Sequence, residues 1–463
     1  MTASAVVVRA VEAFERPVTL RLPFRFGVVT LREASQAFLR TYVERPDGRG
    51  AWGHAAELMI PKWFDKRFDL GNEENVEQLR NSIRVAREIH LCADGYRAPV
   101  DLAHAAEAEQ RRRLADENGL VAGYGPALAA RAVLDAVCRL DGISFYDAVR
   151  TNRIGMRADH LPDDLRGFDI GAFLADLRPR MEIEARHTVG LADPIIEAEV
   201  PEARDGLPES LEAVVARYGH RWFKIKVSGN PDTDLERLAA IAAVLDRLDD
   251  YRTTLDGNEQ FTDIPLLGDF LERLWGDRRL ARLAASIAYV EQPLHRSVAL
   301  DRHLGELADR VPFLIDESDA EDDSVAQARP LGYRGVSSKT CKGLYRSLLN
   351  AARCRHWGAG RYFLSGEDLT TQPGLAVQQD LALVALLGLS HVERNGHHYV
   401  DGMQGAGEAE MDRFARAHPD LYRRDATGLH LEITGGRLRI ASLACAGYAA
   451  GAVPDYDTMR PIV

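Results

Sequence analysis

The sequence predicts an α/β protein: a (β/α)8-type, TIM-like barrel with an α+β capping domain built from the N-terminal region and the C-terminal segment. Eight strand-like segments, each paired with a helical one, follow one another after about residue 180, and eight is the repeat number of such a barrel. An open doubly wound sheet would have fewer units, and no G-x-G-x-x-G phosphate loop follows a strand of this series to support that alternative. We place the capping domain at 1–180, the barrel at 181–424 and the returning C-terminal segment at 425–463.

The N-terminal region combines strands and helices. Residues 6–14, 17–24 and 36–58 have the apolar and β-branched content of strands, and "PDGRG" within the third is a turn between two extended segments. From about 74 to 149 the apolar residues recur at helical spacing, most clearly in "ALAARAVLDAVCRL" before Gly142. The first residues lack the basic and apolar regions of a signal peptide, so we expect a cytoplasmic protein.

The barrel strands are predicted in chain order at "RHTVGLA", "RWFKIKV", "YRTTLDGN", "IAYVEQP", "PFLIDES", "GVSSKTC", "YFLSGED" and "SHVERN". In the helix after the second strand, Asp232 is the expected N-cap. Beyond the barrel, "LHLEITGGRLRIASL" alternates apolar residues on either side of Gly435 and Gly436, which predicts a hairpin. Because a hairpin cannot bury its apolar face alone, we expect this segment to pack on the capping domain.

The composition limits the classes of partner. The 58 basic and 70 acidic side chains give a net charge of −12, which argues against nucleic acid or an anionic membrane as a partner. The five cysteines show no CxxC spacing, so neither a disulfide framework nor a zinc site is indicated and a reducing cytoplasm is expected. The apolar run at 381–389 is far too short to span a membrane.

Three successive predicted strands end in an acidic residue. Asp256, Glu291 and Asp316 each follow an apolar or β-branched run and precede a turn. The C-terminal ends of barrel strands meet at one mouth, so the three carboxylates are expected to converge there. Close carboxylates repel one another unless a cation offsets their charge, and an all-oxygen ligand set suits Mg²⁺.

Two lysines share one of these strands. Lys224 and Lys226 alternate with apolar residues, so both ammonium groups should point to the same face. Repulsion between them, together with a nearby divalent cation, would lower the pKa of at least one toward neutrality, as a general base requires. Lys339, on the sixth strand, would face Lys226 across the mouth and place a base on either side of a bound substrate.

These motifs resemble those of the enolase superfamily, specifically its muconate-lactonizing-enzyme-like (mandelate racemase/muconate lactonizing enzyme) group. The matching motifs are "KIK" at 224–226, "LDGN" at 255–258, "VEQP" at 290–293, "IDES" at 315–318 and "SSKTCKG" at 337–343. The resemblance implies that Asp256, Glu291 and Asp316 bind one Mg²⁺ per site, with Mn²⁺ as an alternative ion. It also implies that Lys226 and Lys339 are an opposed acid/base pair, and that Lys224 assists electrostatically or contacts the substrate carboxylate.

The resemblance further implies that two loops of the capping domain, at 23–30 and 58–66, close over the substrate. Asn258, Arg25, Glu367 and His397 are additional candidates for substrate binding. Two features depart from the group. Gly343 stands where a glycine pair is usual, and the seventh strand, "YFLSGED", carries no histidine that could serve as a base opposite a lysine.

The predicted function is that of a Mg²⁺-dependent enzyme that removes the α-proton of a small carboxylate substrate. The resulting metal-stabilised enediolate would lead to racemisation or epimerisation, or to cycloisomerisation. An acid-sugar-type dehydratase uses the same step and is the alternative. A Schiff-base lyase and a non-catalytic family member are further alternatives. We also expect a homo-oligomer.

Overall fold

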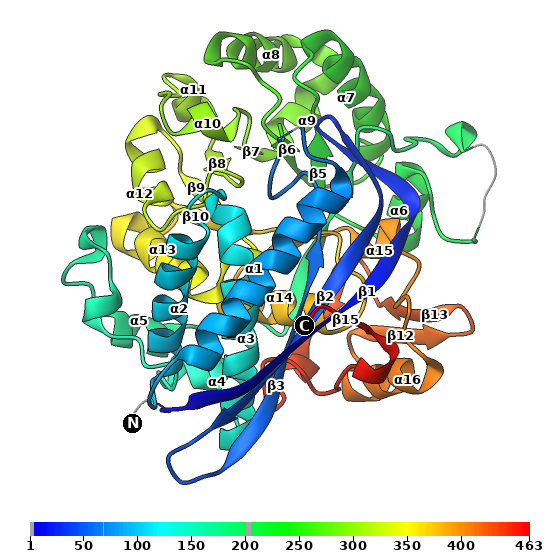
Figure 1. The fold of residues 1–463 in the computed structure, drawn as a ribbon. Helices are drawn as coiled ribbons and strands as arrows, with labels where there is room; N and C mark the ends of the chain where they lie inside the picture. Colours follow the sequence, from blue (N-terminus) through cyan, green and yellow to red (C-terminus); the bar gives the residue numbers. More distant parts are fainter. Residues whose placement is uncertain (1–3, 68, 201–204) are drawn as a thin grey trace.

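The computed structural model describes residues 4–67, 69–200 and 205–463, and it contains the predicted barrel (Figure 1). The eight parallel strands are β4 (Glu182–Val189), β5 (Trp222–Lys226), β6 (Arg252–Asp256), β7 (Ile287–Glu291), β8 (Phe313–Ile315), β9 (Gly335–Ser338), β10 (Phe363–Gly366) and β11 (His391–Arg394). They pair in chain order, and β11 pairs with β4 to close the barrel, with Val392 opposite Ala185. The predicted fold class is thereby confirmed.

Helices surround the barrel on its outer side. They are α6 (Leu211–Tyr218), α7 (Pro231–Leu245), α8 (Ile264–Gly276), α9 (Ala281–Ser286), α10 (Arg296–Ala299), α11 (Leu307–Arg310), α12 (Ser324–Ala328), α13 (Leu344–Gly358), α14 (Leu375–Leu386), α15 (Gly396–Tyr399) and α16 (Glu408–Ala417). The N-cap expected at Asp232 is wrong. Because Pro231 occupies the first helical position of α7, the cap falls on Asn230, whose side chain accepts a hydrogen bond from the backbone N–H of Thr233.

The capping domain is an antiparallel sheet covered by helices. Its strands β1 (Val7–Phe26), β2 (Val29–Glu44) and β3 (Gly50–Met59) pack against α1 (Asn72–Cys92) and α3 (Gly119–Asp141), and α2 (Pro99–Arg113) packs on these two helices. The helices α4 (Phe145–Arg150) and α5 (Ile170–Asp176) lead to the barrel. The long β1–β2 ribbon, dark blue in Figure 1, carries its tip to the mouth of the barrel, where Gly27 lies against Gln260. Residues 26–29 of the capping domain therefore reach the site.

Helix α3 is the central helix of the capping domain. The Asn118 side chain caps its first turn by accepting from the N–H groups of Leu120 and Val121, and Gly142 ends it with a φ of 63°. By length and composition this helix could cross a membrane, but 94% of its apolar window is buried inside the protein. It is therefore accounted for as a core helix.

The C-terminal segment differs from the predicted hairpin. Gly435 and Gly436 do form a turn, with φ values of 59° and 75°, but the strands on either side pair elsewhere. β13 (Gly428–Leu431) pairs with the preceding β12 (Tyr422–Asp425), and β14 (Arg437–Arg439) pairs with residues 182–184 of β4. Residues 182–184 come before Arg186, the first residue of β4 that pairs with β5. The edge of β4 that faces β5 is therefore open at this end, and β14 pairs there.

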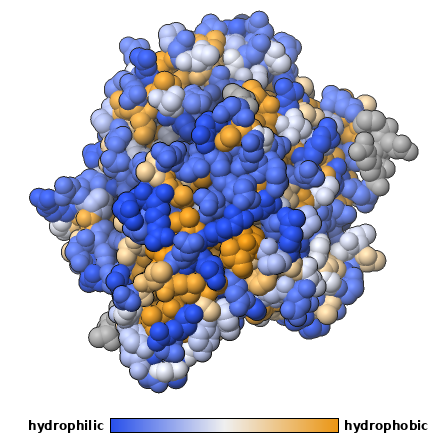
Figure 2. Space-filling view, in the orientation of Figure 1, coloured by the Kyte–Doolittle hydropathy of each residue, from blue (hydrophilic) through white to orange (hydrophobic). Residues whose placement is uncertain are grey.

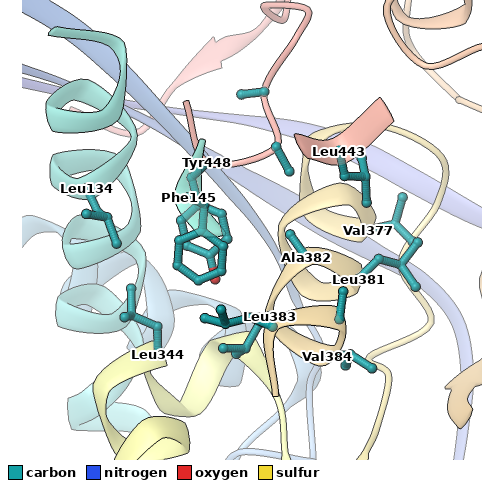
Figure 3. Close-up of a cluster of buried hydrophobic side chains, with 14 of the residues drawn as sticks. Leu134, Phe145, Leu344, Val377, Leu381, Ala382, Leu383, Val384, Leu443 and Tyr448 are labelled. Carbon is teal, nitrogen blue, oxygen red and sulfur yellow. The ribbon is translucent and has the colours of Figure 1, made fainter. Parts of the chain in front are cut away.

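The last residues of the chain join the capping domain. β15 (Arg460–Pro461) pairs with β1, and Tyr448 stacks on Phe145 with ring centroids 3.8 Å apart. Figure 3 shows this contact within a buried cluster in which Leu134 of α3, Leu344 of α13 and Leu383 of α14 also lie. One continuous apolar core thus fixes the capping domain on the barrel. Figure 2 shows a mostly hydrophilic face in which apolar surface gathers in the lower half of the view.

Candidate active site

The predicted catalytic and metal-binding residues lie together at the C-terminal mouth of the barrel. Lys226, Asp256 and Glu291 are aligned across three neighbouring strands, because Lys226 is opposite Asp256 and Asp256 is opposite Glu291 in the sheet register. Asp316 and Lys339 follow β8 and β9 directly. The cavity at this mouth has a volume of ≈ 30 Å³, room for about two water molecules.

The cavity is lined by side chains from both domains. Those from the barrel are Lys224, Lys226, Asp256, Asn258, Asp316, Lys339, Asp368, Leu369, Thr370, Glu393 and Asn395, and those from the capping domain are Phe24, Phe26, Ile60 and Trp63. Both capping loops predicted to cover the site therefore contribute to its walls. The small volume means that these loops enclose the site in this structure.

Lys226 and Lys339 lie on opposite sides of the barrel. Their strands, β5 and β9, are four positions apart in either direction around the eight-stranded ring. The Nζ atom of Lys226 is 2.6 Å from Oδ2 of Asp256, and the Nζ atom of Lys339 is 2.6 Å from Oδ2 of Asp316. A molecule bound between the two lysines would have one amine on each face.

Lys224 occupies a different position from its neighbour Lys226. Its ammonium group lies within 2.8–3.1 Å of the carboxylates of Asp256, Glu291, Glu367 and Glu393. Burial disfavours its charge, but these four carboxylates more than compensate, so the pKa of Lys224 is raised well above its ordinary value. The pKa of Lys339 is also raised, against burial, by Asp316.

The expected lowering of a lysine pKa by its like-charged neighbour is thus not found at Lys224. The residue is surrounded by acids from four strands, two of which lie more than 140 residues further along the chain. Spacing within the motif "KIK" carries no information about these acids. The charge of Lys224 balances part of the negative charge of the site.

The carboxylates have contrasting protonation tendencies. Burial raises the pKa of Glu291 well above its ordinary value, and repulsion from Asp256 and Glu367 raises it further. Burial also acts on Asp256 and Asp316, but ion pairs with lysines outweigh it and the pKa of each is lowered. Glu291 is therefore the acid whose negative charge is least compensated by the protein itself.

The donor set fits a divalent cation. The Oε2 atom of Glu291 is buried and has no hydrogen-bond partner among the described residues, and the same holds for Oδ1 of Asn258 and Oε2 of Glu317. A buried carboxylate oxygen without a partner is unfavourable, and a hard cation that prefers oxygen ligands would satisfy it. Asp256, Glu291 and Asp316 are the residues that would hold Mg²⁺.

Two residues of the sequence motifs position Asp316. The side-chain oxygen of Gln292 accepts hydrogen bonds from the backbone N–H groups of Asp316 (2.8 Å) and Ser318 (3.1 Å), and its amide donates to Ser318 Oγ (2.7 Å). On the other side, Lys342 donates to the carbonyl oxygen of Asp316 (2.6 Å) and lies 3.1 Å from its Oδ1. The glutamine of "VEQP" therefore fixes the loop that carries the third acid.

A buried ion-pair cluster fastens the capping loop to the barrel. Arg296 donates to the carbonyl oxygens of Trp63 (3.0 Å) and Phe64 (3.1 Å), and its Nε is 2.9 Å from Oε1 of Glu259. Lys66 also pairs with Glu259 and donates to the carbonyl oxygen of Asn258 at 2.9 Å. The cluster holds the Trp63 ring so that its centroid is 4.2 Å from Nζ of Lys339. We call Lys66, Glu259 and Arg296 the latch.

The four additional candidates for substrate binding lie in four different places. Asn258 lines the cavity, whereas Glu367 lies beneath it and pairs with Lys224 (2.8 Å) and Arg186. The Arg25 side chain is exposed, because the alternation of the β1 edge turns Phe24 and Phe26 inward instead. His397 is buried against other histidines and lines a separate cavity.

Sequence reasoning missed several residues of the site, including Asn395, Lys66 and Lys342. One signal was available. Only six of the 58 basic residues are lysines, namely Lys62, Lys66, Lys224, Lys226, Lys339 and Lys342. All six lie in the site, in the latch or in the loop that covers the site. In a chain that uses arginine elsewhere, each lysine marks a position where a compact amine is required.

Comparison with known proteins agrees with this architecture. Residues 206–432 match the family model described as enolase C-terminal domain-like. No curated protein gives a significant match. Among solved structures, an enolase from Bradyrhizobium complexed with magnesium and mandelic acid is similar with a TM-score of 0.63 and 15% identity, over 99% of this chain and 98% of that one.

Two further structures cover both chains almost completely. The 2-chloromuconate cycloisomerase from Rhodococcus opacus 1CP has a TM-score of 0.63 and 17% identity over 98% of each chain. The dipeptide epimerase from Enterococcus faecalis V583, complexed with Mg and L-Leu-L-Tyr, has a TM-score of 0.62 and 12% identity over 96% of this chain and 99% of that one. At these identities the likeness establishes the fold. Together with the family match, it confirms the resemblance to the superfamily that the motifs predicted.

Proposed function

We propose that this chain, whose residues 206–432 match the enolase C-terminal domain-like family model, is a Mg²⁺-dependent enzyme that removes the α-proton of a carboxylate substrate. The observation that carries the proposal is the placement of Lys226 and Lys339 on opposite sides of one cavity that Asp256 and Asp316 also line, with Glu291 opposite Asp256 in the sheet register. The solved structures that share the fold include racemase, epimerase and cycloisomerase family members, which supports the same reaction class.

The protein residues have separable roles in this reaction. Lys226 or Lys339 takes the proton from the α-carbon, and the lysine on the other face returns a proton or stabilises the charge that develops there. Lys224 supplies a fixed positive charge below the substrate carboxylate. The capping loops exclude water from the intermediate. Bound Mg²⁺ would stabilise the enediolate and, as a positive charge beside the carboxylate partners of the lysines, would lower their affinity for protons.

The walls of the cavity favour an apolar substituent on the substrate. Phe24, Phe26, Ile60, Trp63 and Leu369 are the apolar residues of the lining. Aromatic and aliphatic side chains disfavour ligands whose hydroxyl groups would lose their hydrogen bonds. This favours racemisation, epimerisation or cycloisomerisation over dehydration of an acid sugar, which carries a hydroxyl on nearly every carbon. We also propose a cytoplasmic, homo-oligomeric enzyme in which Mn²⁺ can replace Mg²⁺.

The test is a library of carboxylates incubated with enzyme and Mg²⁺ in D2O, with exchange at the α-carbon measured by NMR or mass spectrometry. We expect Mg²⁺-dependent exchange with an apolar-substituted acid, and a loss of about 10²–10⁴-fold in Lys226→Ala and Lys339→Ala. Arg221→Ala is the matched control, because Arg221 precedes the opposite end of the same strand and is partly exposed. Exchange that persists undiminished in both lysine variants contradicts the mechanism.

Two outcomes would support the other functions. Trapping of a substrate adduct by borohydride, with full activity in excess EDTA, would indicate a Schiff-base lyase. The absence of exchange with every acid, together with no Mg²⁺ binding by calorimetry, would indicate a non-catalytic member of the family.

A further inference from the structure

A group of buried histidines lies outside the barrel interior. On β4, Arg186 and Thr188 point inward, where they contact Glu367 and Glu393. By strand alternation His187 points outward, toward the helices. There it meets His220, which precedes β5, and His397 of α15, with ring centroids 5.3 and 5.7 Å from its own. Figure 1 shows α6 and α15 on the same side of the barrel, and the Tyr218 ring at the end of α6 is 5.1 Å from that of His397.

The three imidazoles converge through their nitrogen atoms. One ring nitrogen of each of His187, His220 and His397 lies within 4.8 Å of the other two. Three side chains from separate segments meet here without any acid or thiol among them. Aromatic packing alone would not require the polar atoms to be directed at one another.

These nitrogens are available as ligands. His220 bonds through Nδ1 to the carbonyl oxygen of Ala185 at 2.9 Å, so Nδ1 carries the proton and Nε2 carries the lone pair. In the part of the chain that the structure describes, Nε2 of His220, Nδ1 of His187 and both ring nitrogens of His397 have no hydrogen-bond partner. Buried polar atoms normally have a partner, so these nitrogens are free to bind one.

The protonation state of the three histidines is also that of metal ligands. Burial lowers the pKa of His220 to about 4. Burial, followed by the neighbouring histidines, lowers the pKa of His187 and His397 well below the ordinary value. A neutral imidazole keeps one nitrogen lone pair, which is the state that metal ligation requires.

We propose that His187, His220 and His397 form a second metal site, distinct from the carboxylate site, that binds a late first-row divalent cation such as Zn²⁺. An all-imidazole set suits Zn²⁺, Co²⁺, Ni²⁺ or Cu²⁺ and does not suit Mg²⁺ or Ca²⁺, which require oxygen ligands. Three histidines with one position open is a known coordination pattern for Zn²⁺.

The geometry requires only a small adjustment. Zn–N bonds of about 2.0–2.1 Å in a tetrahedral arrangement place the nitrogens about 3.4 Å apart, so pairs at up to 4.8 Å approach one another by at most about 1.4 Å. Rotation of His397 about its side-chain bonds would supply most of this movement. His220 needs no reorientation, because its hydrogen bond to Ala185 is the kind of contact that orients a metal-bound histidine.

Access and local charge are also compatible with a cation. His397 and Tyr218 line a cavity of ≈ 400 Å³, through which an ion and a completing water could enter. The guanidinium of Arg21, which donates to the carbonyl oxygen of His398 at 2.6 Å, is paired with Asp205 at 2.9 Å. The bound metal would tie α15 to β4, directly behind Glu393 and Asn395 of the active site.

The test uses metal-stripped protein in saturating Mg²⁺, which occupies the carboxylate site. We expect one equivalent of Zn²⁺ to bind in calorimetry and Co²⁺ to give the visible absorption of a low-coordinate nitrogen site. The double variant His220→Gln/His397→Gln is expected to bind Zn²⁺ at least about 100-fold more weakly. His418→Gln, which alters a buried histidine elsewhere, should bind as the unaltered protein does. Equal affinity in the double variant overturns the proposal, as does the absence of a Zn²⁺ site in the unaltered protein.

A measurement on the unaltered protein covers the case in which the double variant does not fold. X-ray absorption of the Zn²⁺-loaded, Mg²⁺-saturated protein should show imidazole scattering with nitrogen at about 2.0 Å. A shell of oxygen atoms without imidazole scattering would place the zinc at the carboxylates and refute the second site.

Discussion

Replacing Glu259 with glutamine removes the negative charge of the latch without changing the size of the side chain. Glu259 is fully buried and accepts from the backbone N–H of Arg296 (2.7 Å) and from its guanidinium (2.9 Å), and it pairs with Lys66. Burial opposes the charge, but hydrogen bonds and attraction from Arg296, followed by Lys66, lower the pKa of Glu259 from its ordinary 4.5 to about 2.

The size of the expected loss of stability follows from the difference between the ordinary and the folded-state pKa of Glu259. A carboxyl whose pKa is lower in the folded state than in the unfolded state stabilises the fold above the unfolded pKa. The shift from 4.5 to about 2 corresponds to about 3 kcal/mol, at about 1.4 kcal/mol for each pKa unit. Breaking a buried ion pair by removing one partner costs about 3–5 kcal/mol in other proteins, which agrees. We therefore expect Glu259→Gln to lower the free energy of unfolding by about 3 kcal/mol at pH 7.

The dependence on pH provides the sharper test. The contribution of the ionised Glu259 is complete above pH 4.5 and is lost as the pH falls toward 2, whereas glutamine does not titrate. The difference in unfolding free energy between wild type and variant, measured by urea titration, should therefore shrink between pH 5 and pH 3. Glu236→Gln is the control, because that acid forms an exposed ion pair with Arg279 and should change stability little. A difference that stays constant with pH, or that is negligible at pH 7, would refute the role of the latch.

Four further substitutions follow from the structure. Gln292→Ala removes the acceptor that holds the loop of Asp316, so Mg²⁺ affinity in calorimetry should fall by about 10–100-fold; unchanged affinity would contradict that role. In Gly53→Ala the new Cβ would overlap the backbone of α3, so the free energy of unfolding, measured by thermal denaturation, should fall by about 1–3 kcal/mol. Gly123 has open space around it, so Gly123→Ala should raise the free energy of unfolding by about 0.5–1 kcal/mol. Because burial and nearby acids raise the pKa of Glu291, Glu291→Gln should raise the Tm of the metal-free protein at pH 8 and remove its stabilisation by Mg²⁺; a lower Tm without metal would contradict the charge argument.

The local patterns in the sequence were sufficient to predict the barrel. Each strand is a short apolar run followed by a turn, and the register that aligns Lys226, Asp256 and Glu291 follows from equal positions at successive strand ends. The convergence of Lys226 and Glu291, which are 65 positions apart in the chain, could be predicted because the barrel repeats one strand–helix unit with a fixed symmetry.

Long-range pairings could not be predicted in the same way. The partner of β14 is the open edge of β4, more than 250 residues earlier, and no local pattern marks that edge. The exposed position of Arg25 depends on which side of the β1 edge faces the barrel, which the alternation alone leaves undetermined. The acids around Lys224 and the histidines around His187 are likewise brought together only by barrel closure.

The placement of the six lysines makes the active site unusually easy to observe. Apart from the N-terminal amine, every primary amine of the chain lies in the site, the latch or the covering loop. Selective isotope labelling of lysine would therefore give an NMR spectrum of at most six side-chain signals, all reporting on this region. Amine-directed mass-spectrometric footprinting would likewise read the opening of the capping loop directly, since arginine provides the positive charge elsewhere and does not react with such reagents.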